Sequence, residues 1–375
     1  MVLAENKKIL NSIFGFIKKN VVMTIAFFAA LVTSFIVPVD KEYAGYFDFK
    51  TLTCLFCVLA VVSALKNVNF FYMLAKKIVR MFETTRQSIL ALVYITFIGS
   101  MFIANDMALL TFLPLGYLIL TSTGKEKYMA FTFIMQNIAA NLGGMLTPFG
   151  NPQNLYLYTK FEIPTLEFMK IMAPPFIVAI LMITVCCMQI RSEHLELKDE
   201  KTEVNPLRTV IYLILFAISI FIVFRSIPYQ LGLIVILVSL LIMDRKALKM
   251  VDYPLLFTFF FFFIFSGNMA RIPAVKELFS ILLEKSTLIF SIISCQVISN
   301  VPSAILLSQF TENYKDLLLG VNIGGAGTLI ASLASLITFR EYMKHNPGKA
   351  GKYIFLFSLY NFLFVIVLAV FVSIV

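Results

Sequence analysis

The chain has 375 residues, of which 60% are hydrophobic and only 14% are charged, and its mean hydropathy is +0.90. A soluble globular protein carries about 25% charged residues, and here apolar runs of transmembrane length recur along the whole chain. A single aqueous core is therefore excluded. The net charge of +10 would suggest nucleic acid in a soluble domain, but Lys and Arg lie between the apolar runs. We expect an all-α polytopic protein embedded in a lipid bilayer, with no nucleic-acid partner.

No group of residues has the spacing of a metal or catalytic site. The five cysteines fall inside apolar stretches, and His194 and His345 fall in charged loops. Cys54 and Cys57 match a CxxC spacing, but they lie one helical turn apart without further ligands, which is typical of packing. A membrane-embedded hydrolase would need paired histidines, or a nucleophile and a base, within the spans. We therefore expect no enzyme activity, no cofactor and no transition metal.

Nine apolar stretches are predicted to cross the membrane. They are residues 21–38, 51–65, 129–158, 165–190, 209–225, 229–243, 252–269, 317–339 and 353–374. Two other apolar regions, 87–124 and 286–311, are predicted to enter the membrane and turn back. The second has 26 residues, whereas two crossings and a turn need roughly 40. The first has 38 residues, so its interpretation as a hairpin depends on the internal repeat.

Lys and Arg are shared unevenly between the two sides of these crossings. The side that holds the N-terminus has 22 of the 31, and cytoplasmic loops carry such an excess. The N-terminus is therefore predicted to lie in the cytoplasm and the C-terminus outside, for a multi-pass protein of the plasma (cell inner) membrane.

Two glycine-rich stretches match each other in sequence. Residues 141–155 align without gaps on residues 322–336, and Asn, two Gly, Thr and Leu coincide. Each stretch follows one hairpin candidate, and each candidate has an asparagine near its middle, Asn105 or Asn300. The sequence therefore predicts a duplicated unit that consists of a re-entrant hairpin and a broken span.

The two units are predicted to be inverted, because residues 191–228 contain a charged cytoplasmic loop and one extra crossing. Inverted repeats are typical of secondary transporters, whose sites lie near the membrane midplane where the repeats meet. The first repeat is residues 1–190 (hairpin 87–124, broken helix 129–158), and the second is residues 229–375 (hairpin 286–311, broken helix 317–339).

Residues 147–152, Thr-Pro-Phe-Gly-Asn-Pro, are predicted to break the first of these helices. Each proline removes an amide donor and blocks a continuous helix. The exposed carbonyl groups suit Na⁺, whereas amide ends and Asn, Ser or Thr side chains suit an anion. Glycine pairs in membrane helices also serve close packing, and that alternative stays open for Gly324 and Gly325.

Asp106 is the only acid deep within an apolar region. An ionised Asp at the bilayer centre is unfavourable by about 2.5–3.5 kcal/mol on insertion scales, so such residues face a cavity or are paired. Asp106 is therefore a candidate for proton or cation coupling. The alternative is an Asp that caps the helix after a hairpin turn through its backbone amides.

These motifs resemble the ion transporter superfamily, which holds divalent anion/sodium symporters, citrate-transporter-like permeases, arsenite permeases and some sodium/proton antiporters. Ala104-Asn105-Asp106-Met107-Ala108 is similar to the arsenite-permease hairpin, and residues 144–154 are similar to the citrate-transporter-like broken helix. The resemblance implies a homodimer with a fixed scaffold and a moving transport domain, in an elevator form of alternating access. In the symporters both hairpins read Ser-Asn-Thr, a pattern from which Asp106 and Val301 depart.

Together these patterns predict a secondary active transporter of a small anion or oxyanion, such as a carboxylate, sulfate or arsenite, coupled to Na⁺ or H⁺. The alternative is a cation/proton antiporter that uses Asp106. The residues expected to contact substrate are Asn105, Thr147, Asn154, Ser299, Asn300 and Thr328. Those expected around the coupling ion are Asp106, Asn141, Gly144, Asn151, Asn322, Gly325 and Ser335.

Overall fold

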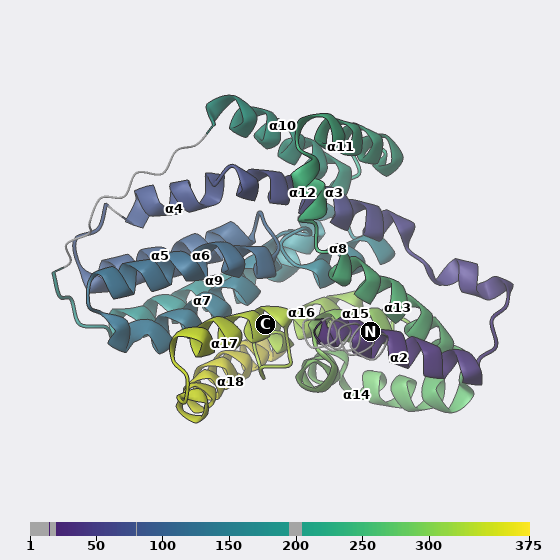
Figure 1. The fold of residues 1–375 in the computed structure, drawn as a ribbon. Helices are drawn as coiled ribbons and strands as arrows, with labels where there is room; N and C mark the ends of the chain where they lie inside the picture. Colours follow the sequence, from purple (N-terminus) through teal and green to yellow (C-terminus); the bar gives the residue numbers. More distant parts are fainter. Residues whose placement is uncertain (1–14, 16–19, 80, 195–204) are drawn as a thin grey trace, which may run out of the picture.

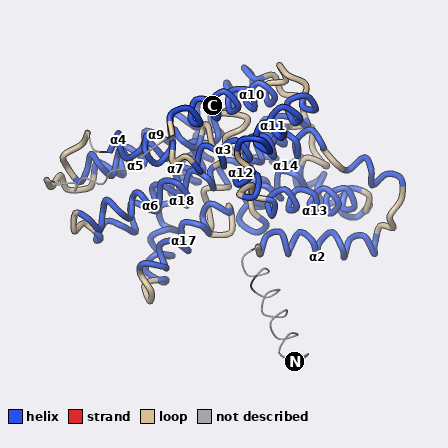
Figure 2. The backbone as a smooth tube through the Cα atoms, turned by 45° about the horizontal axis from the view of Figure 1, so that its top comes forward, coloured by secondary structure: helices blue, strands red, loops and turns tan. Residues whose placement is uncertain are grey.

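The computed structural model describes residues 15, 20–79, 81–194 and 205–375, which are helical throughout apart from turns and short connections (Figures 1 and 2). Within these residues no strand is found, and six helices are long and apolar enough to span a membrane. The shorter helices α2 and α11 are also apolar. The prediction of an all-α polytopic membrane protein is therefore confirmed. The N-terminal lysines used for the orientation, and linker residues 195–204, lie outside the described residues.

One set of helices, which we call the scaffold group, packs around α3 and α13. Asp48 caps α3 by accepting a hydrogen bond from the Thr51 amide at 2.9 Å, and Asp252 caps α13 in the same way. Arg271 ties the end of α13 to the loop after α2 through Asp40 at 2.6 Å. The scaffold group consists of α2 (Val21–Ile36), α3 (Phe49–Asn67), α10 (Pro206–Val223), α11 (Tyr229–Met243), α12 (Arg245–Lys249) and α13 (Tyr253–Ala270).

The first hairpin candidate is a helix–turn–helix, and the helix that follows it is broken. The chain is helical to Gly143 and resumes an α-helix at Pro152, with extended backbone at Thr147 and Asn151. Pro148 and Pro152 lie in or beside this break, as their missing amide donors require. The helices are α5 (Thr85–Ser100), α6 (Asn105–Ser122), α7 (Met129–Gly143), α8 (Pro152–Lys160) and α9 (Thr165–Met188).

The second candidate has the same order of elements. The helix α14 contains a kink at Ser286, whose backbone is not helical, and the chain then runs to a turn at Ser299. A second break separates α16 from α17, between Gly325 and Ser332. The helices are α14 (Pro273–Ile298), α15 (Asn300–Leu307), α16 (Tyr314–Gly324), α17 (Leu333–His345) and α18 (Ala350–Ile374). In Figure 1, α5 and α6 lie on the left of the molecule and α14 lies at the lower right.

The first glycine of each Gly-Gly pair lets the broken helix pack closely against its own hairpin. A Cβ on Gly143 would lie 2.2 Å from the carbonyl oxygen of Phe97 in α5, and a Cβ on Gly324 would lie 2.9 Å from Cys295 Cβ in α14. Such distances leave no room for any side chain. The packing function that the sequence left open is therefore present at Gly324, and it has the same form in both repeats.

Several helices were not expected from the sequence. The segment between Lys66 and Arg86 lies outside every predicted crossing and hairpin, but it contains α4 (Phe70–Val79). The short helix α12 and the first part of α14, up to Lys285, were also missed. These segments carry several charges, so a search for uncharged apolar runs passes over them. Their helices form because one face packs against the apolar core, which a count of uncharged residues does not detect.

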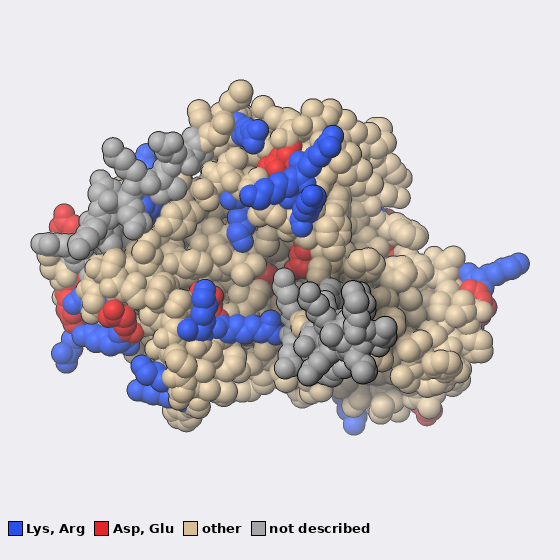
Figure 3. Space-filling model, viewed as in Figure 1, with Lys and Arg blue, Asp and Glu red and all other residues tan. Residues whose placement is uncertain are grey.

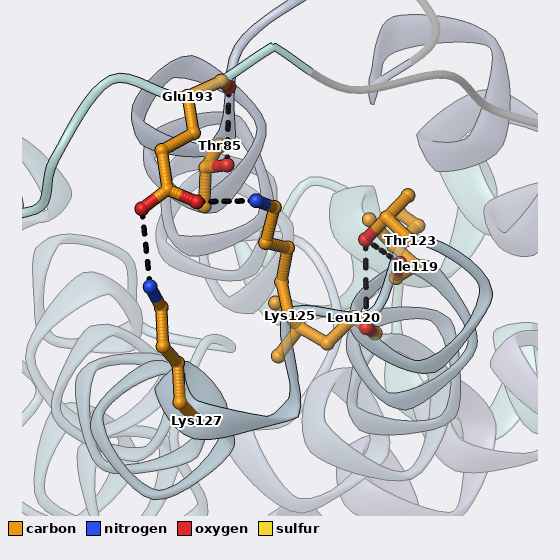
Figure 4. Close-up of polar contacts among 7 residues, drawn as sticks. All are labelled: Thr85, Ile119, Leu120, Thr123, Lys125, Lys127 and Glu193. Carbon is orange, nitrogen blue, oxygen red and sulfur yellow. Dashed lines mark hydrogen bonds and ion pairs between the residues drawn. The ribbon is translucent and has the colours of Figure 1, made fainter.

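Glu193, which follows α9, is bonded to the start of α5 and to the turn after α6 (Figure 4). The Glu193 carboxylate contacts the ammonium groups of Lys125 and Lys127, and its carbonyl oxygen accepts a hydrogen bond from the Thr85 hydroxyl at 3.1 Å. The Lys125 ammonium, followed by that of Lys127, lowers the pKa of Glu193 to about 2. This contact joins the start of α5, the turn after α6 and the end of α9.

We expect Glu193→Gln to lower the apparent melting temperature of the purified protein at pH 7. A lowered pKa in the folded state means that the ionised carboxylate stabilises the fold above its ordinary pKa near 4.5, and that this contribution is lost as the pH falls towards 2. The difference between variant and wild type should therefore narrow below about pH 4.5. Among the described residues no lysine or arginine pairs with the exposed Glu83, so Glu83→Gln is the control. Equal melting temperatures of Glu193→Gln and wild type at pH 7 would show that the Glu193 carboxylate does not stabilise the fold.

Candidate functional site

A cavity of about 460 Å³ lies between the two hairpin turns. Asn105 and Asp106 at the start of α6 line it, as do Ser299 and Asn300 at the turn between α14 and α15. The rest of the wall includes the first turns of α2, α8, α13 and α17. The asparagines of the two hairpins, which are 195 positions apart in the sequence, thus face the same cavity.

Four half-helices begin at this cavity: α6, α8, α15 and α17. The first amide groups of a helix have no partner within it, and the aligned peptide dipoles place partial positive charge at this end. Such ends are sites where anions bind, and discontinuous membrane helices use them in this way. The convergence of four N-termini therefore gives the cavity the electrostatic character of an anion site.

Charged side chains add to this character at the cavity. Lys66 and Lys249 from the scaffold group line it together with Arg340 from α17, and so do two acids, Asp106 and Asp252. Among the described residues that line the cavity, three are basic and two are acidic, so their formal charges sum to +1. Lys and Arg side chains gather over the region of α12 and α17 on the face in Figure 3.

Asp106 is 7% exposed, and its carboxylate forms no hydrogen bond or ion pair with the residues that the structure describes. Its backbone amide instead donates to Asn105 Oδ1 at 2.9 Å. The turn at the start of α6 is thus stabilised by Asn105, and the capping contact proposed for Asp106 is missing. A buried acid without a hydrogen bond or ion pair among the described residues, at the wall of a cavity, is available for a proton or a cation.

The two asparagines are held in matching ways. Asn105 Oδ1 accepts from the amide of the next residue, and Asn300 Oδ1 likewise accepts from the Val301 amide at 2.9 Å. Asn105 Nδ2 donates to Asn141 Oδ1 at 3.0 Å, and a Cβ on Gly325 would lie 2.8 Å from Asn300 Nδ2. Each amide is therefore fixed between its own hairpin and its own broken helix.

The threonines of the repeat connect hairpin and broken helix. The Thr147 hydroxyl donates to the carbonyl oxygen of Met101 at 2.6 Å, and the Thr328 hydroxyl donates to that of Gln296 at 3.2 Å. At the second turn, the amide of Asn300 also donates to the carbonyl oxygen of Ala331 at 2.9 Å. Each hairpin turn is thus hydrogen-bonded to the break in the helix that follows it.

Ser299 has φ 75° and ψ 159°, a conformation that is rare for any residue except glycine. Its hydroxyl lies 3.3 Å from the carbonyl oxygen of Ala331, which helps to hold this geometry. Strain of this kind concentrates at binding sites. The strained residue lies directly on the cavity wall.

Behind the cavity, the two broken helices cross through amide side chains. Asn322 Oδ1 accepts hydrogen bonds from Asn151 Nδ2 at 3.2 Å and from Gln153 Nε2 at 3.3 Å. Asn322 Nδ2 donates to Asn154 Oδ1 at 2.6 Å, and Asn154 Nδ2 donates to the carbonyl oxygen of Gly144 at 3.1 Å. We call these five residues the crossing cluster: Asn151, Gln153, Asn154, Asn322 and Gly144.

The residues predicted from the sequence fall into two layers. Asn105, Asp106, Ser299 and Asn300 line the cavity. The others lie behind it, and most are joined by the contacts above, whereas Ser335 instead bonds to Ser332 at the start of α17. The residues behind the cavity are Asn141, Gly144, Thr147, Asn151, Asn154, Asn322, Gly325, Thr328 and Ser335.

Sequence reasoning missed Gln153 and the charged residues Lys66, Lys249, Asp252 and Arg340. The comparison of repeats selected duplicated polar positions, and Gln153 aligns with Ala334, so it was passed over. The charged residues come from loops or helix ends whose approach to the cavity depends on tertiary packing. Among the described residues, no three His, Cys, Asp or Glu side chains come together as a metal site requires.

Comparisons with known proteins agree with the motifs. A family model described as citrate transporter matches residues 9–314, which include both hairpins and the first broken helix. The chain is 31% identical to an uncharacterized transporter of Methanocaldococcus jannaschii, MJ0456, over 334 residues that cover 87% of this chain and 90% of the relative. It is 29% identical to the inner membrane protein YbiR of Escherichia coli over 318 residues, which cover 82% and 84% of the two chains.

Proposed function

The chain belongs to the citrate transporter family, a family of transporters and not of enzymes, and we propose that it moves a small anion or oxyanion across the membrane by coupling to Na⁺ or H⁺. The observation that carries this proposal is the convergence of the N-termini of α6, α8, α15 and α17 on one cavity. A cavity with four positive helix ends and a surplus of basic side chains favours an anion. Carboxylate and sulfate solutes are anions at neutral pH, and an arsenite-like solute is an anion only in its ionised form.

In this proposal, the substrate binds between Asn105 and Asn300, with Ser299 beside it. All three line the cavity and come from the two hairpin turns. Thr147, Asn154 and Thr328 act by holding the breaks and the turns in place, because their polar atoms already bond to protein groups. The amide ends of the half-helices complete the binding of the anion.

The coupling ion is proposed to bind where Asp106 and the crossing cluster meet. Asp106 supplies a carboxylate that has no hydrogen bond or ion pair among the described residues. The helix breaks are surrounded by the other residues of this group, which are Asn141, Gly144, Asn151, Asn322, Gly325 and Ser335. A cation near the cavity offsets the repulsion between Asp106 and an anionic substrate. The same uncommitted carboxylate favours a second candidate, a cation/proton antiporter, whose activity would need no anion.

We further propose elevator-type alternating access in a homodimer of the plasma membrane, with α5 to α9 and residues 286–375, which begin at the kink in α14, as the moving part. The hairpins belong to this part, whereas Lys66, Lys249 and Asp252 belong to the scaffold group, so the cavity lies on the boundary between them. The basic mouth of the cavity lies on the side that collects most Lys and Arg, which supports an opening towards the cytoplasm. The dimer rests on the resemblance to the superfamily.

Inversion of the repeats predicts opposite sidedness for the far ends of the two hairpins. A single cysteine at residue 124, after α6, should react with an impermeant thiol reagent only from the cytoplasmic side, and one at residue 312, after α15, only from outside. The measurement uses oriented vesicles and compares each variant with the parent chain, whose five native cysteines are all buried and should react little with an impermeant reagent. Labelling of both positions from the same side would contradict the inversion.

A flux screen in proteoliposomes tests the proposed function. Uptake of citrate, succinate, sulfate, phosphate and arsenite is measured with Na⁺ and pH gradients imposed separately. We expect one class of anion to accumulate against its gradient under one of the two driving forces. Exchange of a cation for protons without any anion would favour the antiporter. Absence of flux under either gradient would contradict both the anion transporter and the antiporter.

A further inference from the structure

The cavity between the hairpin turns is larger than a small oxyanion requires. Its volume is about 460 Å³, whereas one water molecule takes about 30 Å³ of liquid volume. A tetrahedral oxyanion such as sulfate is not much larger than a water molecule, so it would leave most of the cavity to solvent. Pockets of about 300–1,000 Å³ usually hold organic molecules, which apolar side chains surround and a few polar groups orient.

Apolar side chains form most of the cavity wall beyond the two hairpin asparagines. Along α6 the wall begins with Asn105 and Asp106, and it continues with Met107 and with Leu110, which lies one helical turn after the acid. At the second hairpin turn, Val301 adds a branched apolar side chain to the wall. Both hairpins therefore place apolar surface directly beside the polar groups that would hold an anion.

The part of the wall that α17 contributes has the same order. Leu333, Leu336 and Ile337 line the cavity and are half-buried, and Arg340 follows them at the exposed edge. Residues at this spacing share one face of a helix, and the seven residues from Leu333 to Arg340 rise ~10 Å. Leu255 of α13 adds apolar surface from the scaffold group. An apolar surface therefore separates the positive end of α17 from the charged edge of the cavity.

The charges at the cavity suit one carboxylate better than two or three. The formal charges of the described lining residues sum to +1, so a single negative charge neutralises them, whereas a dianion or trianion would leave an excess of negative charge. Arg340 and Asp252 each already interact with another group of the protein, so neither is reserved for a second carboxylate. A second carboxylate against the apolar wall would lose hydration without gaining a partner, which is unfavourable.

We infer that the substrate is a monocarboxylate with an apolar tail, such as a linear or branched aliphatic acid of medium length. The inference rests on the proposed function and names its substrate class. The carboxylate binds between Asn105 and Asn300, near the amide ends of the half-helices. The tail lies along Val301, Leu336 and Ile337 and points towards the exposed edge of the cavity.

The test measures how affinity depends on the length of the tail. Acetate, butyrate and octanoate compete with radiolabelled hexanoate for the full-length protein in nanodiscs, and binding to empty nanodiscs is subtracted. We expect the dissociation constant to fall about fourfold for each methylene that the wall covers. The gain should level off once the tail exceeds the ~10 Å of the wall. Hexanol lacks the carboxylate and should bind at least about tenfold more weakly than hexanoate.

A second carboxylate and a change in the wall provide two sharper comparisons. Adipate has the carbon chain of hexanoate but ends in a second carboxylate, so we expect it to bind at least about tenfold more weakly. Leu336→Asn puts a polar group of similar size into the wall, and the gain per methylene should fall. Leu319→Asn is the matched control, because Leu319 is a half-buried leucine of α16 that is not among the described residues lining the cavity. It should keep the wild-type gain.

The outcomes separate this inference from the proposed function. The inference would be overturned by absence of hexanoate binding, by affinity that does not change with tail length, or by adipate binding as tightly as hexanoate. Equal gains per methylene in Leu336→Asn and wild type would overturn it as well. Gradient-driven flux of sulfate, citrate or succinate without any binding of monocarboxylates would overturn it and leave anion transport standing. Binding that follows tail length, without flux of any anion, would support the ligand class and count against transport.

Discussion

We expect Asp106→Asn to lose uptake that is driven by an ion gradient while it keeps a folded transport site. Asparagine has the shape of aspartate but carries no charge and does not titrate near neutral pH. Asp106 is buried at the cavity without a partner among the described residues, so the substitution removes charge and no hydrogen bond. A coupling free energy of about 1–3 kcal/mol corresponds to an effect of about 5- to 150-fold. Gradient-driven uptake should fall by that factor.

The measurement compares uptake by wild type and variant across a range of pH, with and without a Na⁺ gradient. A pH dependence that disappears in the variant would identify Asp106 as the proton carrier. Asp48→Asn is the control, because Asp48 is not among the residues that line the cavity and asparagine can keep the cap on α3. Transport by Asp106→Asn equal to wild type at every pH and gradient would remove Asp106 from coupling.

Two simple signals in the sequence predicted most of the helices. Uncharged apolar length identified α2, α9, α10, α11 and α18 to within a few residues. Proline and glycine marked the break between α7 and α8, because a missing amide donor interrupts a helix wherever it occurs. The kink at Ser286 has a different local cause, because the Ser286 hydroxyl accepts a hydrogen bond from the Ile289 amide at 3.2 Å and so caps the second part of α14.

The candidate site was predictable only where the two repeats share a residue. Asn105 and Asn300 were found because both hairpins contain an asparagine, and both line the cavity. Gln153 aligns with Ala334 and has no counterpart, so symmetry could not point to it. Lys66 and Lys249 reach the cavity from the scaffold group, through contacts between segments far apart in the chain. A repeat within one sequence contains no information on such contacts.

The difference between the repeats has a functional consequence. The first hairpin places an acid directly after its asparagine, whereas the second places Val301 there. The first broken helix carries Asn151, Gln153 and Asn154, where the second carries Ser332, Ala334 and Ser335. Polar groups suited to a cation are therefore concentrated in the first repeat. We therefore predict that coupling depends more on the first repeat, through Asp106, and that Asn300 in the second repeat acts mainly on the anion.

Asn300→Ala tests that division, and we expect it to weaken binding of the transported anion by about 10- to 150-fold. Hydrogen bonds to charged groups contribute about 1.5–3 kcal/mol, which gives this range of dissociation constants. The change removes the amide that lies on the cavity and the bond from the Val301 amide to its oxygen. The measurement is equilibrium binding of the anion that the flux screen identifies, to protein in detergent or nanodiscs.

Asn313→Ala separates this effect from a general loss of helix capping. Asn313 caps α16 by accepting from the Asp316 amide at 3.3 Å, and it is not among the residues that line the cavity. This control should lower stability by about 0.5–2 kcal/mol and leave the dissociation constant of the anion unchanged. If the second repeat acts mainly on the anion, Asn300→Ala should also leave the affinity for the coupling ion that the flux screen identifies unchanged when no anion is present. Wild-type anion affinity in Asn300→Ala would exclude its side chain from the site, and a matching loss of affinity for the coupling ion would contradict the division between the repeats.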